Sequence, residues 1–247
     1  MITVETIRER HSVREYDGKP LSRAEFDALG AVVEECARES GLDIQLVGDN
    51  PEVFNVIARF GLIRGCHTHV AFVIDDAKAR GVAADEAIGY WGQKIVLAAQ
   101  DMGFNTCWCA LCSRKKSRAV VAPGKKIRLI IAVGHGKTQG FSRKTKSVEA
   151  LSSVECAKAP AWFAAAMEAA QLAPTAMNNQ NFKITLFSDG KTVRIDAPQS
   201  GLNVIDEGIV RCNFEIAANE AGADWRWERD IRLSRGVLRG ALGFGCC

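Results

Sequence analysis

The segment Arg10-His11-Ser12-Val13-Arg14 gathers two guanidinium groups, an imidazole and a hydroxyl within five residues. It follows a predicted short helix at Val4–Arg10 and leads into a turn at His11–Gly18. Guanidinium groups and hydroxyls donate the charge-assisted hydrogen bonds that a phosphate dianion accepts. A basic cluster after a helix is more often a solvated surface, so this spacing alone leaves phosphate binding open.

The composition is that of a folded globular protein. The chain has 247 residues, of which 47% are hydrophobic and 25% charged, enough for one large domain or two modest halves sharing a core. A net charge of +3 gives no reason to expect a nucleic-acid partner. The longest apolar runs, such as Ile127–Val133, are too short to cross a bilayer, and the N-terminus lacks the apolar core of a secretory signal. We therefore expect a cytoplasmic protein with no membrane partner.

The nine cysteines are an odd number without a secretory context, so free thiols are expected. Cys107, Cys109 and Cys112 form C-x-C-x-x-C, which raises the question of a zinc or iron–sulfur site. Such a site normally needs four ligands, and the fourth would have to come from elsewhere in the chain, with Cys66 and His67 as candidates. We favour a loop of small residues after a helix, with no metal, and interpret His67 and His69 as surface or core histidines.

Hydrophobic periodicity predicts alternating helices and strands in the first half of the chain. Ser22 begins S-R-A-E, a capping box in which Glu25 takes the reciprocal position. Asp85–Met102 is apolar on most faces, which predicts a buried helix that Gly103 ends. The predicted helices are Val4–Arg10, Arg23–Glu39 and Asp85–Met102, and the predicted strands are Asp43–Val47, Val70–Ile74 and Ile127–Val133.

The second half follows a similar plan. Pro174 ends an apolar helix, and Asp189-Gly190 is a typical hairpin turn between two strands. The predicted helices are Trp162–Leu172 and Asp206–Glu220, and the predicted strands are Lys183–Ser188, Thr192–Asp196 and Ala223–Glu228.

The two long helices end in a shared pattern, A-x-acid-x-G-x4-W. It occurs at Ala99–Gly103 with Trp108, and again at Ala218–Gly222 with Trp227. Many helices end in Gly, but the shared Ala, acid and Trp favour an internal duplication. Each half alone would leave an apolar face exposed, so we expect residues 1–146 and 147–247 to pack together as one compact unit.

A second polar segment follows the helix Trp162–Leu172. It reads Ala173-Pro174-Thr175-Ala176-Met177-Asn178-Asn179-Gln180-Asn181-Phe182. Its hydroxyl, amide and backbone groups can read the edge of a planar ring. A polar loop that uses Asn for turn geometry is the commoner origin of such a sequence.

Taken together, these segments resemble the nitroreductase family of FMN enzymes. The family's R-[RH]-S-x-[RK] is matched by Arg10, His11, Ser12 and Arg14. Its A-P-S-x-x-N-x-Q-P-W strip is matched by Ala173, Pro174, Thr175, Asn178 and Gln180, with Asn181 and Phe182 replacing Pro and Trp. Gly103–Trp108 resembles the family's G-L-G-[ST]-C-W, and Gly134–Lys137, followed by Arg143, Lys144 and Lys146, resembles its G-Y-P strand end and later basic pair.

The order of the motifs departs from the family. The A-P-S strip usually lies soon after the R-[RH]-S segment, whereas here about 160 residues separate them. In the family's homodimers the phosphate segment and the strip come from different subunits. The chain is therefore similar to the single-chain, pseudo-dimeric branch, in which both subunits are fused. This resemblance implies an α+β nitroreductase-like fold with mostly antiparallel sheets and the two long helices packed between the halves.

The resemblance also implies where one FMN would lie. Arg10, His11 and Ser12 would bind its phosphate with help from Arg143, Lys144 or Lys146, and Arg14 would lie near the N1–C2 edge of the flavin. The loop of Trp108, Cys109, Ala110 and Leu111 would present a backbone N–H toward flavin N5. Pro174, Thr175, Ala176, Asn178 and Gln180 would face the ring and ribityl chain from the other half.

The implied function is an FMN-dependent oxidoreductase. It would pass hydride from NADH or NADPH through the flavin to a nitroaromatic, a quinone or a similar small-molecule acceptor, with no catalytic side chain required. Two alternatives stay open: a degenerate flavin-binding protein without activity, and a divergent flavin enzyme such as a reductive dehalogenase. A monomer would suffice, because the chain would be its own pseudo-dimer.

Overall fold

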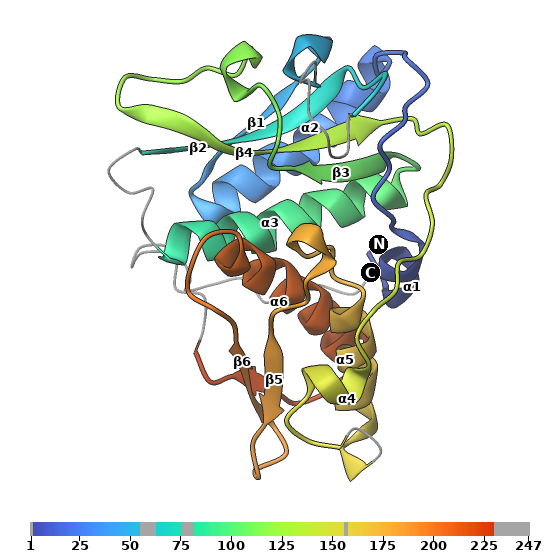
Figure 1. Cartoon of the computed structure of the whole chain (residues 1–247), viewed down its shortest axis with the longest axis vertical. Helices are drawn as coiled ribbons and strands as arrows, with labels where there is room; N and C mark the ends of the chain where they lie inside the picture. Colours follow the sequence, from blue (N-terminus) through green and yellow to red (C-terminus); the bar gives the residue numbers. More distant parts are fainter. Residues whose placement is uncertain (1, 55–62, 76–81, 156–157, 230–247) are drawn as a thin grey trace, which may run out of the picture.

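The computed structural model describes residues 2–54, 63–75, 82–155 and 158–229 and has an α+β architecture. Long helices lie between a sheet of the first half and a sheet of the second (Figure 1). The helices are α1 Val4–Glu9, α2 Arg23–Ser40, α3 Val82–Asp101, α4 Val148–Leu151, α5 Ala161–Gln171 and α6 Asn203–Glu220, with 3-10 turns η1 Pro51–Phe54, η2 Arg114–Lys116 and η4 Ala176–Asn178. The strands are β1 Asp43–Val47, β2 Thr68–Asp75, β3 Asn105–Cys109, β4 Lys125–Gly134, β5 Lys183–Leu186, β6 Thr192–Asp196 and β7 Arg226–Trp227.

The first sheet has the order β1-β2-β4-β3, and every neighbouring pair is antiparallel. Its centre is β2, which is buried from Thr68 to Ile74 and pairs with β4, placing Val70 opposite Ile131. A strand buried on both faces reads as a continuous apolar run, which is why the sequence predicts its central position. The capping box predicted at Ser22 is confirmed: Ser22 Oγ accepts from Glu25 N, and Glu25 Oε2 accepts from Ser22 N at 2.8 Å.

The strand β3 corrects the sequence analysis, which predicted a loop of small residues at Cys107 and Cys109. Asn105–Cys109 pairs antiparallel with β4 and forms an edge of the sheet. Thr106 and Trp108 favour strands by themselves, a signal that the sequence analysis did not use, and pairing with the edge of β4 completes the strand. Cys107 and Cys109 are both buried in the same hydrophobic cluster, whereas Trp108 packs against the main core.

The sheet of the second half consists of the predicted hairpin β5–β6 and a short parallel strand, β7. In the turn, Asp189 Oδ1 accepts from the backbone N–H groups of Lys191 (3.0 Å) and Thr192 (2.8 Å), and Gly190 has φ 68°. The predicted strand Ala223–Glu228 is reduced to Arg226–Trp227. Among the strand pairs that the structure describes, this last one alone is parallel, so the prediction of mostly antiparallel sheets is confirmed.

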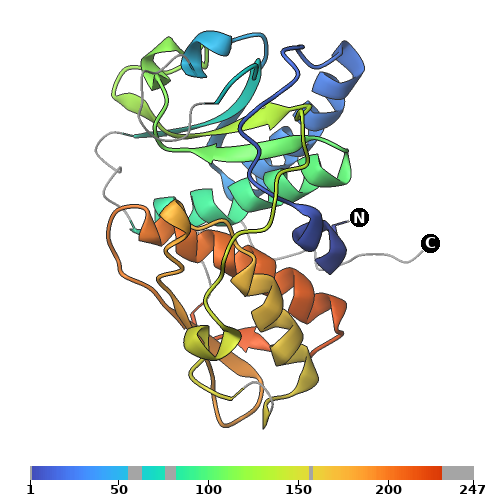
Figure 2. The ribbon, with the colours of Figure 1, turned by 45° about the vertical axis from the view of Figure 1, so that its right-hand side comes forward.

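Helices α3 and α6 cross between the sheets, with α2 beside α3 and α5 beside α6 (Figures 1 and 2). One hydrophobic core includes residues of both halves, among them Ile88 and Ile95 of α3 and Ile209 and Phe214 of α6. The predicted placement of the two long helices is therefore observed. Because the core is shared, we expect the halves to fold as one unit.

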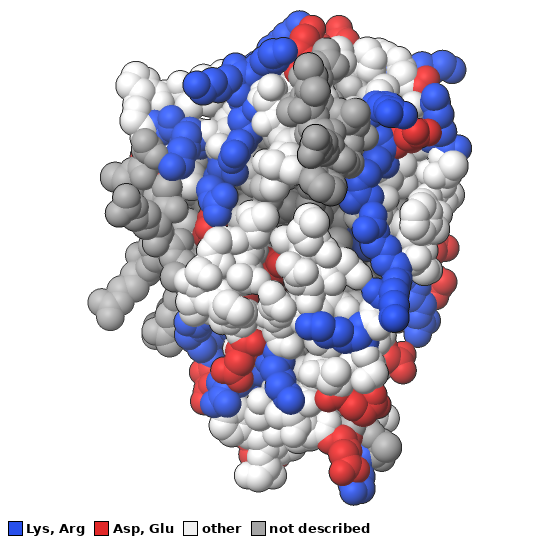
Figure 3. Space-filling model, viewed as in Figure 1, with Lys and Arg blue, Asp and Glu red and all other residues white. Residues whose placement is uncertain are grey.

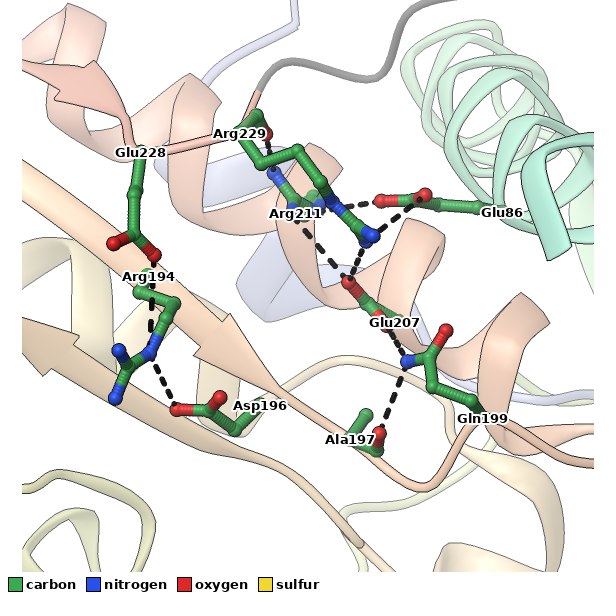
Figure 4. A network of polar contacts seen from close by, with 9 residues as sticks. All are labelled: Glu86, Arg194, Asp196, Ala197, Gln199, Glu207, Arg211, Glu228 and Arg229. Carbon is green, nitrogen blue, oxygen red and sulfur yellow. Dashed lines mark hydrogen bonds and ion pairs between the residues drawn. The ribbon is translucent and has the colours of Figure 1, made fainter.

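A buried ionic cluster also joins the two helices (Figure 4). Arg211 of α6, with 2% of its side chain exposed, lies with its Nε 2.8 Å from Glu86 Oε1 of α3 and its Nη2 3.4 Å from Glu207 Oε1. Arg229 Nη2 approaches Glu86 Oε2 and Glu207 Oε1 at 3.6 Å and 3.3 Å, and Gln199 Nε2 donates to Glu207 Oε2. Every charge in the cluster thus has an opposite charge nearby, as burial requires.

The repeated helix ends are similar in structure only in part. Gly103 (φ 86°) and Gly222 (φ 65°) both adopt the left-handed conformation after their helices, and each precedes a strand that carries the Trp. However, β3 runs antiparallel to its neighbour and β7 runs parallel. Among the residues that the structure describes, no helix has the length and apolarity needed to cross a membrane.

Candidate functional site

The segment Arg10–Arg14 leaves α1 and runs alongside the first residues of β3. Val13 N donates to Thr106 O at 3.0 Å, and Ser12 forms a parallel bridge with Thr106. The backbone is therefore held against the sheet, with Arg10 and Val13 buried and the side chains of His11, Ser12 and Arg14 half-buried. The segment is therefore partly buried against the sheet and is not a fully solvated surface.

Arg10 has the features of an anion ligand. It is only 8% exposed, and Nε is buried without a hydrogen-bond partner in the described part of the chain. Burial lowers the pKa of the guanidinium to about 10, so the group is still charged at neutral pH. A buried charge that lacks full pairing is costly, and an anionic ligand would relieve that cost.

Two further guanidinium groups lie in the same neighbourhood. Burial raises the pKa of the Cys107 thiol to about 11. Three cations oppose that rise, because each lies close enough to favour the thiolate: Arg14, Arg10 and Arg143. The three cations come from two segments far apart in the sequence. Together they concentrate positive charge beside β3, which suits a ligand with two negative charges.

The segment that carries Arg143, residues 134–147, lies beside the Arg10–Arg14 segment and then continues into the second half of the chain (Figure 2). His11 Nε2 lies 3.3 Å from Ser142 Oγ, and a Cβ on Gly140 would lie 2.7 Å from His11 Cβ. Lys and Arg side chains follow this side of the molecule in the right half of Figure 3. Arg143, Lys144 and Lys146 are exposed members of the segment.

The strip Pro174–Gln180 is joined to the same basic segment. Asn178 Nδ2 donates to Lys144 O at 2.7 Å, and Gln180 Oε1 accepts from Lys146 N at 2.7 Å. Lys146 Nζ donates to Gln180 O at 3.0 Å, so this ammonium is engaged by the strip rather than by the cluster around Cys107. The residues predicted to meet from the two halves are thus connected through residues 142–146.

The backbone of the strip is strained. The φ angles of Met177, Asn178 and Gln180 are 53°, 55° and 47°. These values lie in the left-handed region, which residues other than Gly rarely adopt. Gln180 is held by Thr175 Oγ1, which accepts from its N–H at 3.0 Å, and by its own Nε2, which donates to Gln171 O at 2.9 Å. Strain that the surroundings fix in this way is typical of ligand-binding segments. Pro174 and Ala176 are half-buried, and Thr175 is buried.

Asp206 is a residue of this site that the sequence analysis missed. It lies in the first turn of α6, and its Oδ1 accepts from Ala176 N at 2.9 Å. Burial raises the pKa of its carboxyl to about 6, an effect that this hydrogen bond only partly offsets. An acid near a helix start is ordinary in sequence. Only the fold reveals that this one is buried against the strip.

In the predicted loop Trp108–Leu111, Trp108 and Cys109 are instead the last two residues of β3, and Ala110 and Leu111 follow the strand. Arg14 acts electrostatically on the Cys109 thiol. The Trp108 side chain points inward: it stacks on Phe72 at 6.2 Å, and its Nε1 donates to Gln93 Oε1 at 3.3 Å. Cys109 is buried, Ala110 half-buried and Leu111 exposed. The indole of Trp108 is therefore held in the core.

The histidines named in the sequence analysis have ordinary structural surroundings. His69 is fully buried, with its Nε2 2.8 Å from Ser117 Oγ, and burial lowers its pKa to about 4. His67 is half-buried, with its Nδ1 3.1 Å from Asp49 Oδ1. Within the described ranges, no group of three or more His, Cys, Asp or Glu side chains is arranged to hold a metal ion.

Comparison with known proteins is consistent with this fold. The family model described as "Putative TM nitroreductase" matches residues 2–218. A Thermotoga maritima structure described as a "putative nitroreductase" is 21% identical and aligns with a TM-score of 0.63 over 90% of this chain and 85% of its own. No curated protein matches this chain.

Two shorter nitroreductases resemble part of the chain. A Desulfovibrio desulfuricans structure described as a "putative nitroreductase in complex with fmn" is 19% identical, with a TM-score of 0.47 over 62% of this chain and 95% of its own. An FMN-dependent nitroreductase from Clostridium difficile is 14% identical, with a TM-score of 0.45 over 64% of this chain and 98% of its own. The family match spans nearly the whole chain. The protein therefore belongs to the "Putative TM nitroreductase" family, and by that membership it is an oxidoreductase with the nitroreductase fold.

Proposed function

We propose that this protein is an FMN-dependent NAD(P)H oxidoreductase that binds one FMN between its two halves, residues 1–146 and 147–247. The observation that carries the proposal is the incompletely paired, buried guanidinium of Arg10, with Arg14 and Arg143 acting on the same neighbourhood. A phosphate dianion fits such a cluster, because it accepts several charge-assisted hydrogen bonds at once.

The residues of the first half would bind the phosphate and tune the ring. Arg10, His11 and Ser12 hold the phosphate together with Arg143 or Lys144. Lys146 contributes through the strip, because its ammonium already binds Gln180 O. Arg14 would lie near the N1–C2 edge of the ring, where a cation would favour the reduced flavin.

The residues of the second half would line the ring and the ribityl chain. Pro174 and Ala176 supply apolar contact, while Thr175, Asn178 and Gln180 keep the strained backbone in place. In the segment of Trp108, Cys109, Ala110 and Leu111, the residues that follow β3, Ala110 and Leu111, would donate a backbone hydrogen bond to the ring. Asp206, through Ala176 N, fixes the position of the strip.

When bound, FMN supplies the hydride chemistry between NADH or NADPH and a small-molecule acceptor such as a nitroaromatic or a quinone. The residues of the chain hold and orient the reactants and exclude water, and no side chain is required to move a proton. The strip and the basic segment are connected within one chain, so a monomer is sufficient for the site.

The experiment is a reductant titration of the purified protein reconstituted with FMN. We expect a bound-flavin absorbance spectrum that NADH or NADPH bleaches and that a nitroaromatic or quinone restores under anaerobic conditions. Bound flavin that neither nucleotide reduces would indicate the degenerate binding protein, and reoxidation by a halogenated acceptor alone would indicate the dehalogenase. A protein that binds no FMN contradicts the proposal.

A further inference from the structure

Cys109 and Cys112 lie together at the end of β3, spaced as Cys-Ala-Leu-Cys. Cys112 Sγ is 3.5 Å from Cys109 O, so the turn after the strand folds the second cysteine back over the first. Each thiol also acts on the pKa of the other. Disulfide formation needs two cysteines held close together, and this turn brings Cys112 Sγ to the backbone of Cys109.

The two thiols have different surroundings. Cys112 is half-buried, and its pKa is lowered by the hydrogen bond from Cys109 and by the positive charge of Arg114, against the opposing effect of burial. Cys109 is 7% exposed, and the same hydrogen bond and its burial raise its pKa. A reactive thiol paired with a buried resolving thiol is the arrangement that thiol–disulfide exchange uses.

Arg114 is held in position for this effect. Its Nη1 donates to Arg128 O of β4 at 2.7 Å, and the turn itself is fixed by Ser113 N, which donates to Val53 O at 2.8 Å. The neighbouring thiols are less reactive: burial raises the pKa of Cys107 to about 11 and that of Cys66 to about 12. Cys66 is further occupied by Thr68 O and Val133 O at 3.2 Å and 3.3 Å.

We propose that Cys109 and Cys112 form a redox-active dithiol that closes to an intramolecular disulfide by exchange with a small-molecule disulfide. The Cys112 thiolate attacks one sulfur of the small disulfide, whose S–S bond breaks, and one thiol is released. Cys109 then loses its proton to water and attacks Cys112 Sγ, releasing the second thiol. Two protein thiols are oxidised and one small disulfide is reduced to two thiols, so atoms and electrons balance without a flavin.

The test is redox titration of the full chain in buffers of graded oxidised-to-reduced glutathione, with thiols alkylated at equilibrium and located by peptide fragmentation. We expect Cys109 and Cys112 to lose alkylation together and Cys107 to keep it, with dithiothreitol restoring both. Retained alkylation of Cys109 and Cys112 across the whole series would overturn the proposal. A disulfide that uses Cys107 or a glutathione adduct that never closes would overturn it too.

Two substitutions separate the roles of the thiols. In Cys109→Ala, glutathione should stay attached to Cys112, and the pH midpoint for alkylation of Cys112 should rise because the hydrogen bond from Cys109 is removed. In Cys112→Ser, neither a disulfide nor an adduct at the buried Cys109 is expected.

The matched control is Cys36→Ser, which removes a buried thiol on α2 and should leave the titration unchanged. An adduct on Cys109 instead of Cys112 would contradict the assignment. The wild-type titration decides the matter even where a variant does not fold, and it is independent of FMN binding.

Discussion

Gly89 of α3 lies directly against Gly208 of α6 at the crossing of the two long helices. A Cβ on Gly89 would lie 2.0 Å from Ile205 O and 3.0 Å from Gly208 Cα, and a Cβ on Gly208 would lie 2.0 Å from Glu86 O. The helices therefore approach through their backbones, which only glycine permits. This contact determines how closely the two halves pack.

We predict that Gly208→Ala destabilises the fold, because the added methyl group meets backbone atoms that cannot rotate away. Overpacking of a core typically costs about 1–3 kcal/mol, and the backbone contact places this site at the upper end. Denaturant unfolding measures the free-energy change. Gly30→Ala on α2 is the control: its Cβ would meet only Leu46 Cδ2 at 3.9 Å, so it should be neutral or stabilising by up to roughly 1 kcal/mol. Equal effects of the two substitutions would contradict the packing argument.

A second prediction concerns the buried ionic cluster. Arg211→Met leaves the buried Glu86 and Glu207 with only the more exposed Arg229, and should cost about 3–5 kcal/mol of unfolding free energy. Replacing Glu86 by Gln in the same chain should recover part of that loss. Arg194→Met is a matched control, because Arg194 pairs with Asp196 at the surface and should change stability by less than about 1 kcal/mol. If the loss of unfolding free energy in the double variant equals the sum of the losses in the two single variants, Arg211 and Glu86 are not energetically coupled.

A third prediction follows from Asp206. Its carboxyl pKa is about 6 in the folded protein against an ordinary 3.8, so the folded state binds the proton more tightly than the unfolded state. The stabilisation is complete below pH 4 and is lost as the pH rises through 6. At about 1.4 kcal/mol per pKa unit, the loss is roughly 3 kcal/mol.

Chemical unfolding of Asp206→Asn between pH 4 and pH 7 tests this prediction. The stability of the variant relative to the wild type should increase across that window, because Asn can still accept from Ala176 N but does not ionise. A difference between the two proteins that stays constant with pH would show that Asp206 titrates normally.

A fourth prediction concerns the phosphate cluster. Arg10→Ala should weaken FMN binding by roughly 1.5–3 kcal/mol for each charged hydrogen bond lost, about a tenfold to hundredfold rise in Kd per bond. Flavin fluorescence quenching measures this Kd. Arg23→Ala removes the same charge from an exposed position on α2 and should leave the Kd unchanged. If Arg10→Ala binds FMN as tightly as Arg23→Ala does, the phosphate lies elsewhere.

Much of the fold could be predicted because local signals mark its elements. The strands Asp43–Val47 and Thr192–Asp196 match their predicted bounds, since Gly41 (φ 67°) and the Asp189-Gly190 turn precede them. The strand β3 was missed because its two strand-favouring residues, Thr106 and Trp108, lie in a segment of only five residues, too short to indicate a strand by itself. Its structure comes from pairing with β4, which starts about 20 residues later in the chain.

The site could be predicted only where a motif marks it. The basic residues and the strip are visible in the sequence, but the burial of Arg10 depends on packing between distant segments. Asp206 was missed because its partner, Ala176, is 30 residues away. The cluster of Glu86, Glu207 and Arg211 likewise has no local signal, since it forms where two helices cross.

The binding stoichiometry of FMN tests the central claim most directly. Titration of the purified protein with FMN, combined with the molar mass of the complex in solution, gives the number of flavins per chain and the number of chains per complex. We predict one FMN per chain in a monomer, because the phosphate cluster and the strip both belong to the same chain. One FMN per two chains, two per chain, or no saturable binding would contradict a single site between the halves of one chain.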